Sequence, residues 1–283
     1  MEGELWEVVY PMLQELGKQY RETKVQYQTW RIAEVFLWAV LHDRPVSWAC
    51  QRCNWPADQQ HMEFPSSSCM SRRLQRPKVQ SLLDALEGIF RQRHGQPLFR
   101  CIDAMPLVIG GSSGDKQAGY GRAAASKAKG YKFFAICTPQ GIVEAWRVGP
   151  MNYSEKTMAT RLLRDIQGEG YLVGDGEYDS NTLYHYAGSK GIQLVAPKQK
   201  GGLGHRRQSP YRLRSMELTI GAFGRKMLHQ RASIDRFFGQ WNSSGCGLKH
   251  LPPWVRTHQR VRRWVQAKLI MNYVWRERSR LMG

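Results

Sequence analysis

The sequence has no long apolar stretch and no export signal. No run reaches the roughly 18 apolar residues that a helix needs to cross a bilayer, so no membrane span is expected. The first residues, MEGELWEVVYPMLQELGKQ, are acidic and amphipathic, whereas a signal peptide is basic and then apolar. We therefore expect a cytoplasmic protein.

Acidic residues are also scarce. The 283 residues include 42 lysines and arginines but only 23 aspartates and glutamates, which gives a formal net charge of +19. Lysine and arginine release the counterions condensed on phosphates, so this excess favours a polyanionic partner such as nucleic acid. From residue 198 onward, 19 basic residues stand against three acids. The 42% of hydrophobic residues can form a core, which excludes a disordered basic tail and fits one large domain or two smaller ones.

Only two of the six cysteines have the spacing of metal ligands. Cys50 and Cys53 lie in SWACQRCNW, and a tetrahedral zinc site would need two further ligands, for which His61 and Cys69 could be recruited. We favour reduced, partly buried thiols over zinc.

The region 1–95 has a helical pattern. Two apolar-periodic segments predict helices over 2–16 and 27–43. Farther along, a run of serines gives an N-terminal cap signal for a helix within 64–90. This helix carries Arg72, Arg73 and Arg76. A short helix, a turn and an arginine-rich helix form the layout of a DNA-binding helix-turn-helix, with an ordinary helical bundle as the alternative.

The pattern changes near residue 96. Apolar runs and amphipathic segments predict, in order, strands at 97–110, 130–138 and 141–149, a helix at 155–167, a strand at 171–178, a helix at 181–191 and a strand at 192–197. This order predicts a mixed α/β sheet flanked by helices, in a domain spanning 96–251.

The remaining segments are basic. The glycine-rich segments 110–129 and 198–214 are expected to form mobile loops. Helical patterns follow at 232–242 and 255–278, and the second defines a basic C-terminal helix, 252–283. Aromatic residues among these arginines would suit stacking on unpaired bases, although helical spacing is more typical of core residues. They are Trp241, Trp254, Trp264 and Trp275.

Two of the few acids lie at predicted strands. Asp103 lies within FRCIDAMP, and Asp175 follows the fourth strand in YLVGDGEYDS, between two glycines. A carboxylate there is costly unless it is paired or binds a cation. Two on neighbouring strands could bind Mg²⁺ or Mn²⁺ through oxygen, and Asp235 is the candidate third acid.

At these residues the sequence resembles the DDE-type transposases of bacterial insertion sequences. The resemblance runs from Leu98 to about Leu251 through CIDAMP, GYKFF, VGDGEYDS and a third-acid helix, and PSSSCMSRRL upstream resembles their DNA-binding helices. Where the family has Tyr-x2-Arg-x3-Glu, this chain has Leu228, Arg231 and Asp235. The hydroxyl is missing, and the third carboxylate is one methylene shorter.

The resemblance implies an RNase H-like catalytic domain. Asp103, Asp175 and Asp235 would hold two Mg²⁺ or Mn²⁺ ions that activate water to cut the transposon end, after which the freed 3′-OH attacks target DNA. Glu177 is an alternative third acid or a support for Asp175.

The resemblance also implies partners. The expected DNA contacts, besides Arg72, Arg73 and Arg76, are Arg231, Lys127, Lys129, Lys132, Lys198, Arg206 and Arg207. A homodimer on double-stranded DNA, at terminal inverted repeats and target, in the bacterial nucleoid is expected. The alternative function is a catalytically inactive, sequence-specific DNA-binding protein derived from a transposase.

Overall fold

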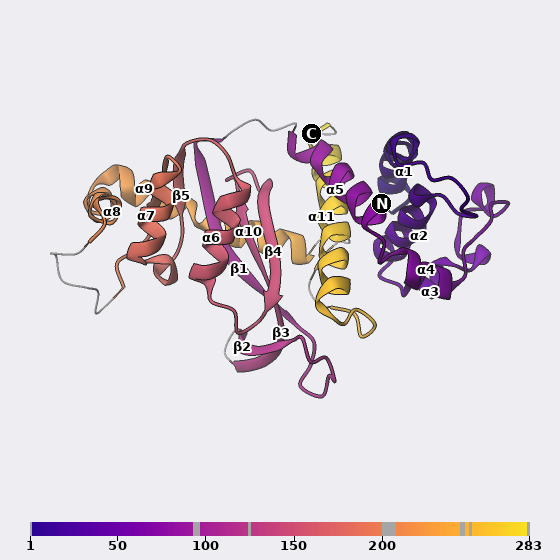
Figure 1. Ribbon diagram of the computed structural model, residues 1–283. Helices are drawn as coiled ribbons and strands as arrows, with labels where there is room; N and C mark the ends of the chain where they lie inside the picture. Colours follow the sequence, from indigo (N-terminus) through magenta and orange to yellow (C-terminus); the bar gives the residue numbers. More distant parts are fainter. Residues whose placement is uncertain are drawn as a thin grey trace.

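The computed structural model describes residues 2–92, 97–123, 126–199, 208–243, 247–248 and 251–281 (Figure 1). The N-terminal part is helical, as the sequence predicts. Its elements are α1 (Glu2–Gln19), α2 (Thr29–Leu41), α3 (Val46–Ala49), the 3-10 turns η1 (Arg52–Asn54) and η2 (Ala57–Gln59), α4 (Ser67–Arg73) and α5 (Pro77–Gln92). Helix α2 packs against α1, α5 and the C-terminal helix and is buried on nearly every side.

The helix expected within 64–90 is two helices. Ser66 caps α4 by accepting a hydrogen bond from the Cys69 amide at 3.2 Å, which confirms the serine cap. Helix α5 begins at Pro77, because proline fits the first turn of a helix but cannot continue a preceding one. Helix α4 is therefore only seven residues long, and the helix-turn-helix stays a prediction.

The centre of the fold is a mixed sheet. Its strands are β1 (Phe99–Val108), β2 (Gly119–Ala123), β3 (Ser126–Cys137), β4 (Val143–Pro150), β5 (Gly170–Val173) and β6 (Ile192–Val195). Strands β1, β5 and β6 are parallel neighbours, while β3 is antiparallel to β1 and β4 is antiparallel to β3. The predicted mixed α/β sheet is thus confirmed.

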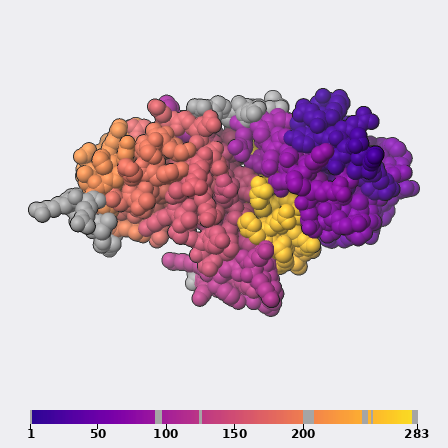
Figure 2. Space-filling view, in the orientation of Figure 1, coloured from indigo at the N-terminus to yellow at the C-terminus, as the bar shows by residue number. Residues whose placement is uncertain are grey.

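The segment 110–129 differs from the expected mobile loop. Residues 119–123 and 126–130 pair as a β-hairpin that extends the start of β3 beyond the end of β1. We call this feature, β2 with the first five residues of β3, the basic hairpin. It projects at the lower edge of the molecule in Figures 1 and 2.

Helices cover both faces of the sheet. α6 (Glu155–Asp165) and α7 (Asn181–Ser189) bury Phe134 and Ile136 on one face. On the other face, Phe133 packs against Trp241 of α10 (Ala232–Ser243), with the ring centroids 5.1 Å apart. Successive residues of β3 therefore enter opposite cores, as strand alternation requires.

Two more helices fill the segment before α10. They are α8 (Pro210–Ile220) and α9 (Ala222–Gln230). Helix α8 packs against β6 and α7, so the expected loop over 198–214 is helical from Pro210 onward. The central part of that loop, including Arg206 and Arg207, lies outside the described residues.

The C-terminal helix, α11 (His258–Leu281), is a core element. It packs against α1, α2, α5 and β4, and Figure 2 shows it wedged between the N-terminal helices and the sheet. Its basic residues are partly internal: Lys268 is fully buried and pairs with Asp43 at 2.7 Å, and Arg263 donates to the Leu74 carbonyl. The basic C-terminal helix expected over 252–283 thus has some of its basic residues inside the fold, and the division of the chain into domains stays a prediction.

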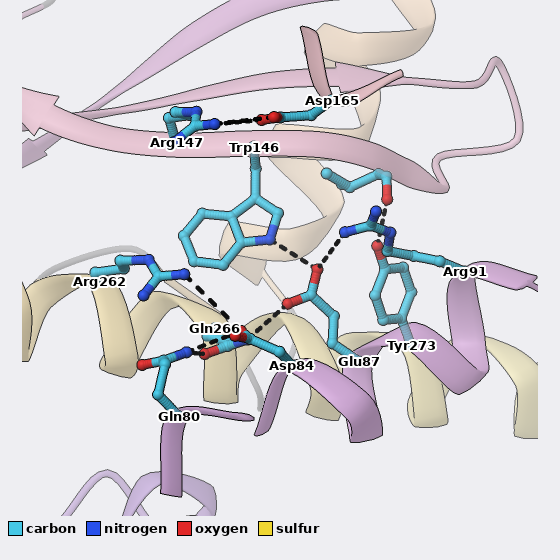
Figure 3. Close-up of polar contacts among 11 residues, drawn as sticks. Gln80, Asp84, Glu87, Arg91, Trp146, Arg147, Asp165, Arg262, Gln266 and Tyr273 are labelled. Carbon is cyan, nitrogen blue, oxygen red and sulfur yellow. Dashed lines mark hydrogen bonds and ion pairs between the residues drawn. The ribbon is translucent and has the colours of Figure 1, made fainter. Parts of the chain in front are cut away.

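A polar joint connects the helical part to the edge strand β4 (Figure 3). The Glu87 carboxylate of α5 accepts hydrogen bonds from the Trp146 indole at 2.8 Å and from the Gln266 amide at 2.9 Å. These contacts link α5, β4 and α11 in one network beside a cleft of about 410 Å³. Among the described residues, no helix is long and apolar enough to cross a membrane.

Candidate active site

The sheet register brings Asp103 and Asp175 to the same level. Strands β1 and β5 are parallel, with Cys101 opposite Val173, the last residue of β5. Asp103 lies two residues after Cys101, in the middle of β1. Asp175 lies two residues after Val173, just past the end of β5. A step of two residues keeps a side chain on the same face of a sheet, so the two acids are neighbours at the carboxyl end of β5.

Local hydrogen bonds orient both acids. The Asp175 carboxylate accepts from the Glu177 amide at 2.9 Å and caps the 3-10 turn η3 (Gly176–Tyr178). Asp103 accepts from the amide of Ala104 at 2.7 Å. The Glu177 side chain itself is exposed, so its role as an alternative third acid stays a hypothesis.

Gly174 leaves room for this turn. A Cβ atom at residue 174 would lie 2.7 Å from the Tyr178 ring and 3.1 Å from the Ile102 side chain. The glycine therefore lets the chain turn over a buried tyrosine directly before Asp175.

Helix α10 carries Asp235 toward the two strand acids. The Cys101 thiol of β1 lies 3.3 Å from the Gln230 carbonyl and 3.5 Å from the Ser233 hydroxyl, which fixes the start of α10 against β1. Cys101 precedes Asp103 by two residues, so the helix start lies on the face that bears Asp103. The Asp235 side chain is 51% exposed.

Arg231 lies between two of the acids. One guanidinium nitrogen is 3.4 Å from the Asp235 carboxylate, and another is 3.9 Å from the Asp175 carboxylate. The first contact follows from the i, i+4 spacing on a helix. The second is a tertiary contact between the α9–α10 junction and the turn after β5.

The electrostatics of Asp103 show that the acids act on one another. Burial, with a smaller contribution from the nearby charges of Asp175 and Asp235, raises the pKa of Asp103 to about 7, against the opposing effects of the Ala104 amide and Arg231. A site that disfavours its own negative charge in this way is favourable for a cation.

The donor set fits a hard divalent cation, because it consists of carboxylate oxygens. In the arrangement shown, however, the described residues contain no group of three His, Cys, Asp or Glu side chains that could hold an ion. The same finding gives no support to zinc at Cys50 and Cys53.

The arginines expected to contact DNA from α4 differ in exposure. Arg72 is exposed, and Arg76 is half-exposed, 3.8 Å from Glu22. Arg73 is only 8% exposed and pairs with Glu22 at 2.6 Å, so it is held inside the fold. Its burial argues against a DNA contact.

Two of the four lysines expected to contact DNA lie on the basic hairpin. Lys127 and Lys129 both approach the ring of Tyr120, which is 52% exposed. Lys132, by contrast, pairs with Glu155 at 2.6 Å and is largely buried. Lys198 is exposed.

The four C-terminal tryptophans considered for base stacking also differ in exposure. Trp241 and Trp264 are buried, so the core interpretation holds for them and base stacking does not. Trp254 is 38% exposed, and Trp275 is partly buried.

One buried pair near the site was not expected. Arg212 of α8 donates two hydrogen bonds of 2.7 Å to Asp179, which also accepts from the Gln199 amide. These bonds tie the turn after Asp175 to α8. The second aspartate of VGDGEYDS was the available signal, but its partner lies in a segment that the sequence predicts to be a loop.

Comparison with known proteins identifies the class. The family model described as "Transposase DDE domain" matches residues 94–274, and the chain therefore belongs to the DDE transposase family. A cryo-EM structure of a piggyBac transposase synaptic complex with hairpin DNA is similar in fold, with a TM-score of 0.50 and 10% identity over 94% of this chain and 71% of that chain. Comparison with curated proteins gives no match.

Proposed function

We propose that this protein is a metal-dependent transposase of a bacterial insertion sequence. It would cut phosphodiester bonds at the element's ends and join the 3′-OH to target DNA. The observation that carries the proposal is the convergence of Asp103, Asp175 and Asp235 from β1, β5 and α10, with the charges of the other two acting on the buried Asp103. The order and direction of the strands support an RNase H-like sheet.

The three aspartates are the proposed holders of two Mg²⁺ or Mn²⁺ ions. When bound, such ions activate the attacking oxygen and stabilise the leaving 3′ oxygen of the DNA. Asp103 is the central acid because it is the most buried and lies between the other two in its electrostatic contacts. Asp175 is held by the turn that it caps, and Asp235 is the most adaptable because it is the most exposed.

The proposed partner is double-stranded DNA, bound by a homodimer that aligns two element ends within the bacterial nucleoid. The related piggyBac structure contains DNA, which supports this partner. The basic hairpin extends β3 away from Ala135, the residue opposite Asp103. Lys129 is six residues from Ala135, or about 20 Å along the strand, which corresponds to about six base pairs of duplex.

Cleavage of a labelled end duplex with Mg²⁺ or Mn²⁺ tests the chemistry. The duplex sequence comes from inverted repeats flanking the reading frame. Asp103→Asn and Asp175→Asn should abolish nicking and leave DNA binding intact. The control Asp165→Asn, at an acid paired with Arg147 on the surface, should change neither nicking nor binding. Tight binding by the wild type without any nick would support the inactive DNA-binding alternative.

Comparing Asp235→Asn with Glu177→Gln tests the third acid. Loss of nicking in Asp235→Asn alone is expected. Loss in Glu177→Gln alone would assign the role to Glu177.

A footprint tests the basic hairpin. Replacing Lys127 and Lys129 by glutamine should remove backbone protection about six base pairs from the cut and lower the salt dependence of binding by about two phosphate contacts. Protection unchanged at that distance would remove the hairpin from the interface.

A further inference from the structure

Arg231 lies beside two of the three acids that are proposed to bind metal. It forms the C-cap of α9 directly before α10, and its guanidinium faces Asp175 on one side and Asp235 on the other. It is thus a cation already placed among the acids that would hold Mg²⁺ or Mn²⁺.

The contacts of Arg231 are weak enough to exchange. Its side chain is 36% exposed, and its nearest carboxylate oxygens are 3.4 and 3.9 Å away. Partly exposed ion pairs of this kind contribute little, so a stronger anion can replace them. A phosphate is such an anion, because its oxygens match the planar fork of a guanidinium.

We propose that Arg231 is an internal counterion which holds Asp175 and Asp235 in the free protein and leaves them for a DNA phosphate, so that DNA binding prepares the acids for divalent metal. The inference rests on the proposed function. It assigns Arg231 a positioning role, acting through the two acids, and it explains why three adjacent carboxylates form no ready metal group in the described residues.

Because metal binds the acids and DNA draws the Arg231 guanidinium away from them, metal binding and DNA binding are thermodynamically linked, with two consequences. In the absence of DNA, the guanidinium competes with the metal, so its removal strengthens metal binding. With DNA present, that competition is relieved, so DNA strengthens metal binding in the wild type. Linkage is reciprocal, and the metal must strengthen DNA binding by the same factor.

Mn²⁺ binding measured by electron paramagnetic resonance tests these consequences without any catalytic readout. The variants are Arg231→Gln and a matched control, Arg236→Gln, whose exposed side chain bonds to the Ala232 carbonyl on the same helix. Each is titrated with Mn²⁺ alone and with a pre-cleaved end duplex. Arg231→Gln should bind Mn²⁺ about three- to tenfold more tightly without DNA, the range for losing one or two partly exposed ion pairs, and Arg236→Gln should match the wild type.

The DNA arm supplies the second criterion. The duplex should raise Mn²⁺ affinity by a larger factor in the wild type than in Arg231→Gln. Equal or weaker Mn²⁺ binding by Arg231→Gln without DNA, or an equal effect of DNA on both proteins, would overturn the role of Arg231.

Asp103→Asn separates this inference from the proposed function. Among the described residues, the carboxylates within 4 Å of the Arg231 guanidinium are those of Asp175 and Asp235, so loss of the Asp103 carboxylate should weaken Mn²⁺ binding whether or not Arg231 acts as a counterion. If Asp103→Asn binds Mn²⁺ as tightly as the wild type, the three acids do not hold the ion and the proposed active site fails as well.

Discussion

Glu87 offers the sharpest test of how the helical part is held against the sheet. Its carboxylate is 4% exposed and accepts from Trp146, Gln266 and, at 3.4 Å, Arg91 (Figure 3). Replacing Glu87 by alanine leaves the indole N–H without its acceptor and removes one of the two acceptors of the buried Gln266 amide, which keeps its bond to Asp84. A buried polar group that loses its partner costs about 1–3 kcal/mol, so Glu87→Ala should lower the free energy of unfolding by about 2–4 kcal/mol. Glu87→Gln keeps one acceptor oxygen and should cost about half as much.

Thermal unfolding followed by far-UV circular dichroism measures this effect. For a chain of this size, each kcal/mol lowers Tm by about 2–4 °C, so Glu87→Ala should unfold about 4–16 °C below the wild type. The matched control is Asp165→Ala at the rim of the same cleft, where Asp165 pairs with Arg147 in a solvent-exposed contact of 2.6 Å. Such a pair contributes at most about 1 kcal/mol. A Glu87→Ala variant no less stable than Asp165→Ala would refute the joint as a stabilising contact.

Three further predictions concern single positions. Gly174→Ala should lower stability by about 1–3 kcal/mol because its Cβ would press on the Tyr178 ring, whereas Gly88→Ala, with open space around it, should not; equal urea denaturation midpoints would contradict this. Asp179→Asn should cost about 3–5 kcal/mol by leaving the buried Arg212 unpaired, and a loss under 1 kcal/mol in urea denaturation would show that the pair is dispensable. Burial raises the pKa of Glu34 to about 7 despite its pairing with Arg31, so the folded state holds this proton more tightly than the unfolded state does. The resulting stability is present below about pH 4.5 and is lost as the pH rises through 7, by up to about 3 kcal/mol. Glu34→Gln should lack this dependence, and parallel pH profiles for the two proteins would speak against it.

The strands and the two strand acids could be predicted because their signals are local. A buried strand appears as an apolar run, and a glycine on each side of Asp175 marks the turn after it. The level placement of Asp103 and Asp175 could not be predicted, because register is set by pairing between strands that lie some 70 residues apart in the chain.

The sequence predicts a loop over 110–129, where part of the basic hairpin forms, for a physical reason. Most side chains of β2 and of the first residues of β3 face solvent or are only partly buried, so this part of the sequence has no apolar alternation. Backbone hydrogen bonds between β2 and β3 hold the hairpin together, and such bonds cannot be recognised from the residue types. At α11, too, composition does not show burial, because Arg263 and Lys268 lie inside the fold although lysine and arginine are mostly exposed in proteins.

The charge balance at the candidate site depends on the fold and cannot be obtained from the sequence spacing of the charged residues. The i, i+4 spacing predicts that Arg231 and Asp235 share one helical face, and on that basis alone they would be a neutral surface pair. The fold adds Asp175 from the end of β5 and Asp103 from the middle of β1, so one guanidinium now lies near three carboxylates and pairs with two of them. Because Asp103 is buried and has a raised pKa, the deficit of positive charge is greatest where water can least offset it. A chain with a net charge of +19 thus folds so that three of its acids form a local site short of positive charge, which the pairing of Arg231 with two of them offsets only in part.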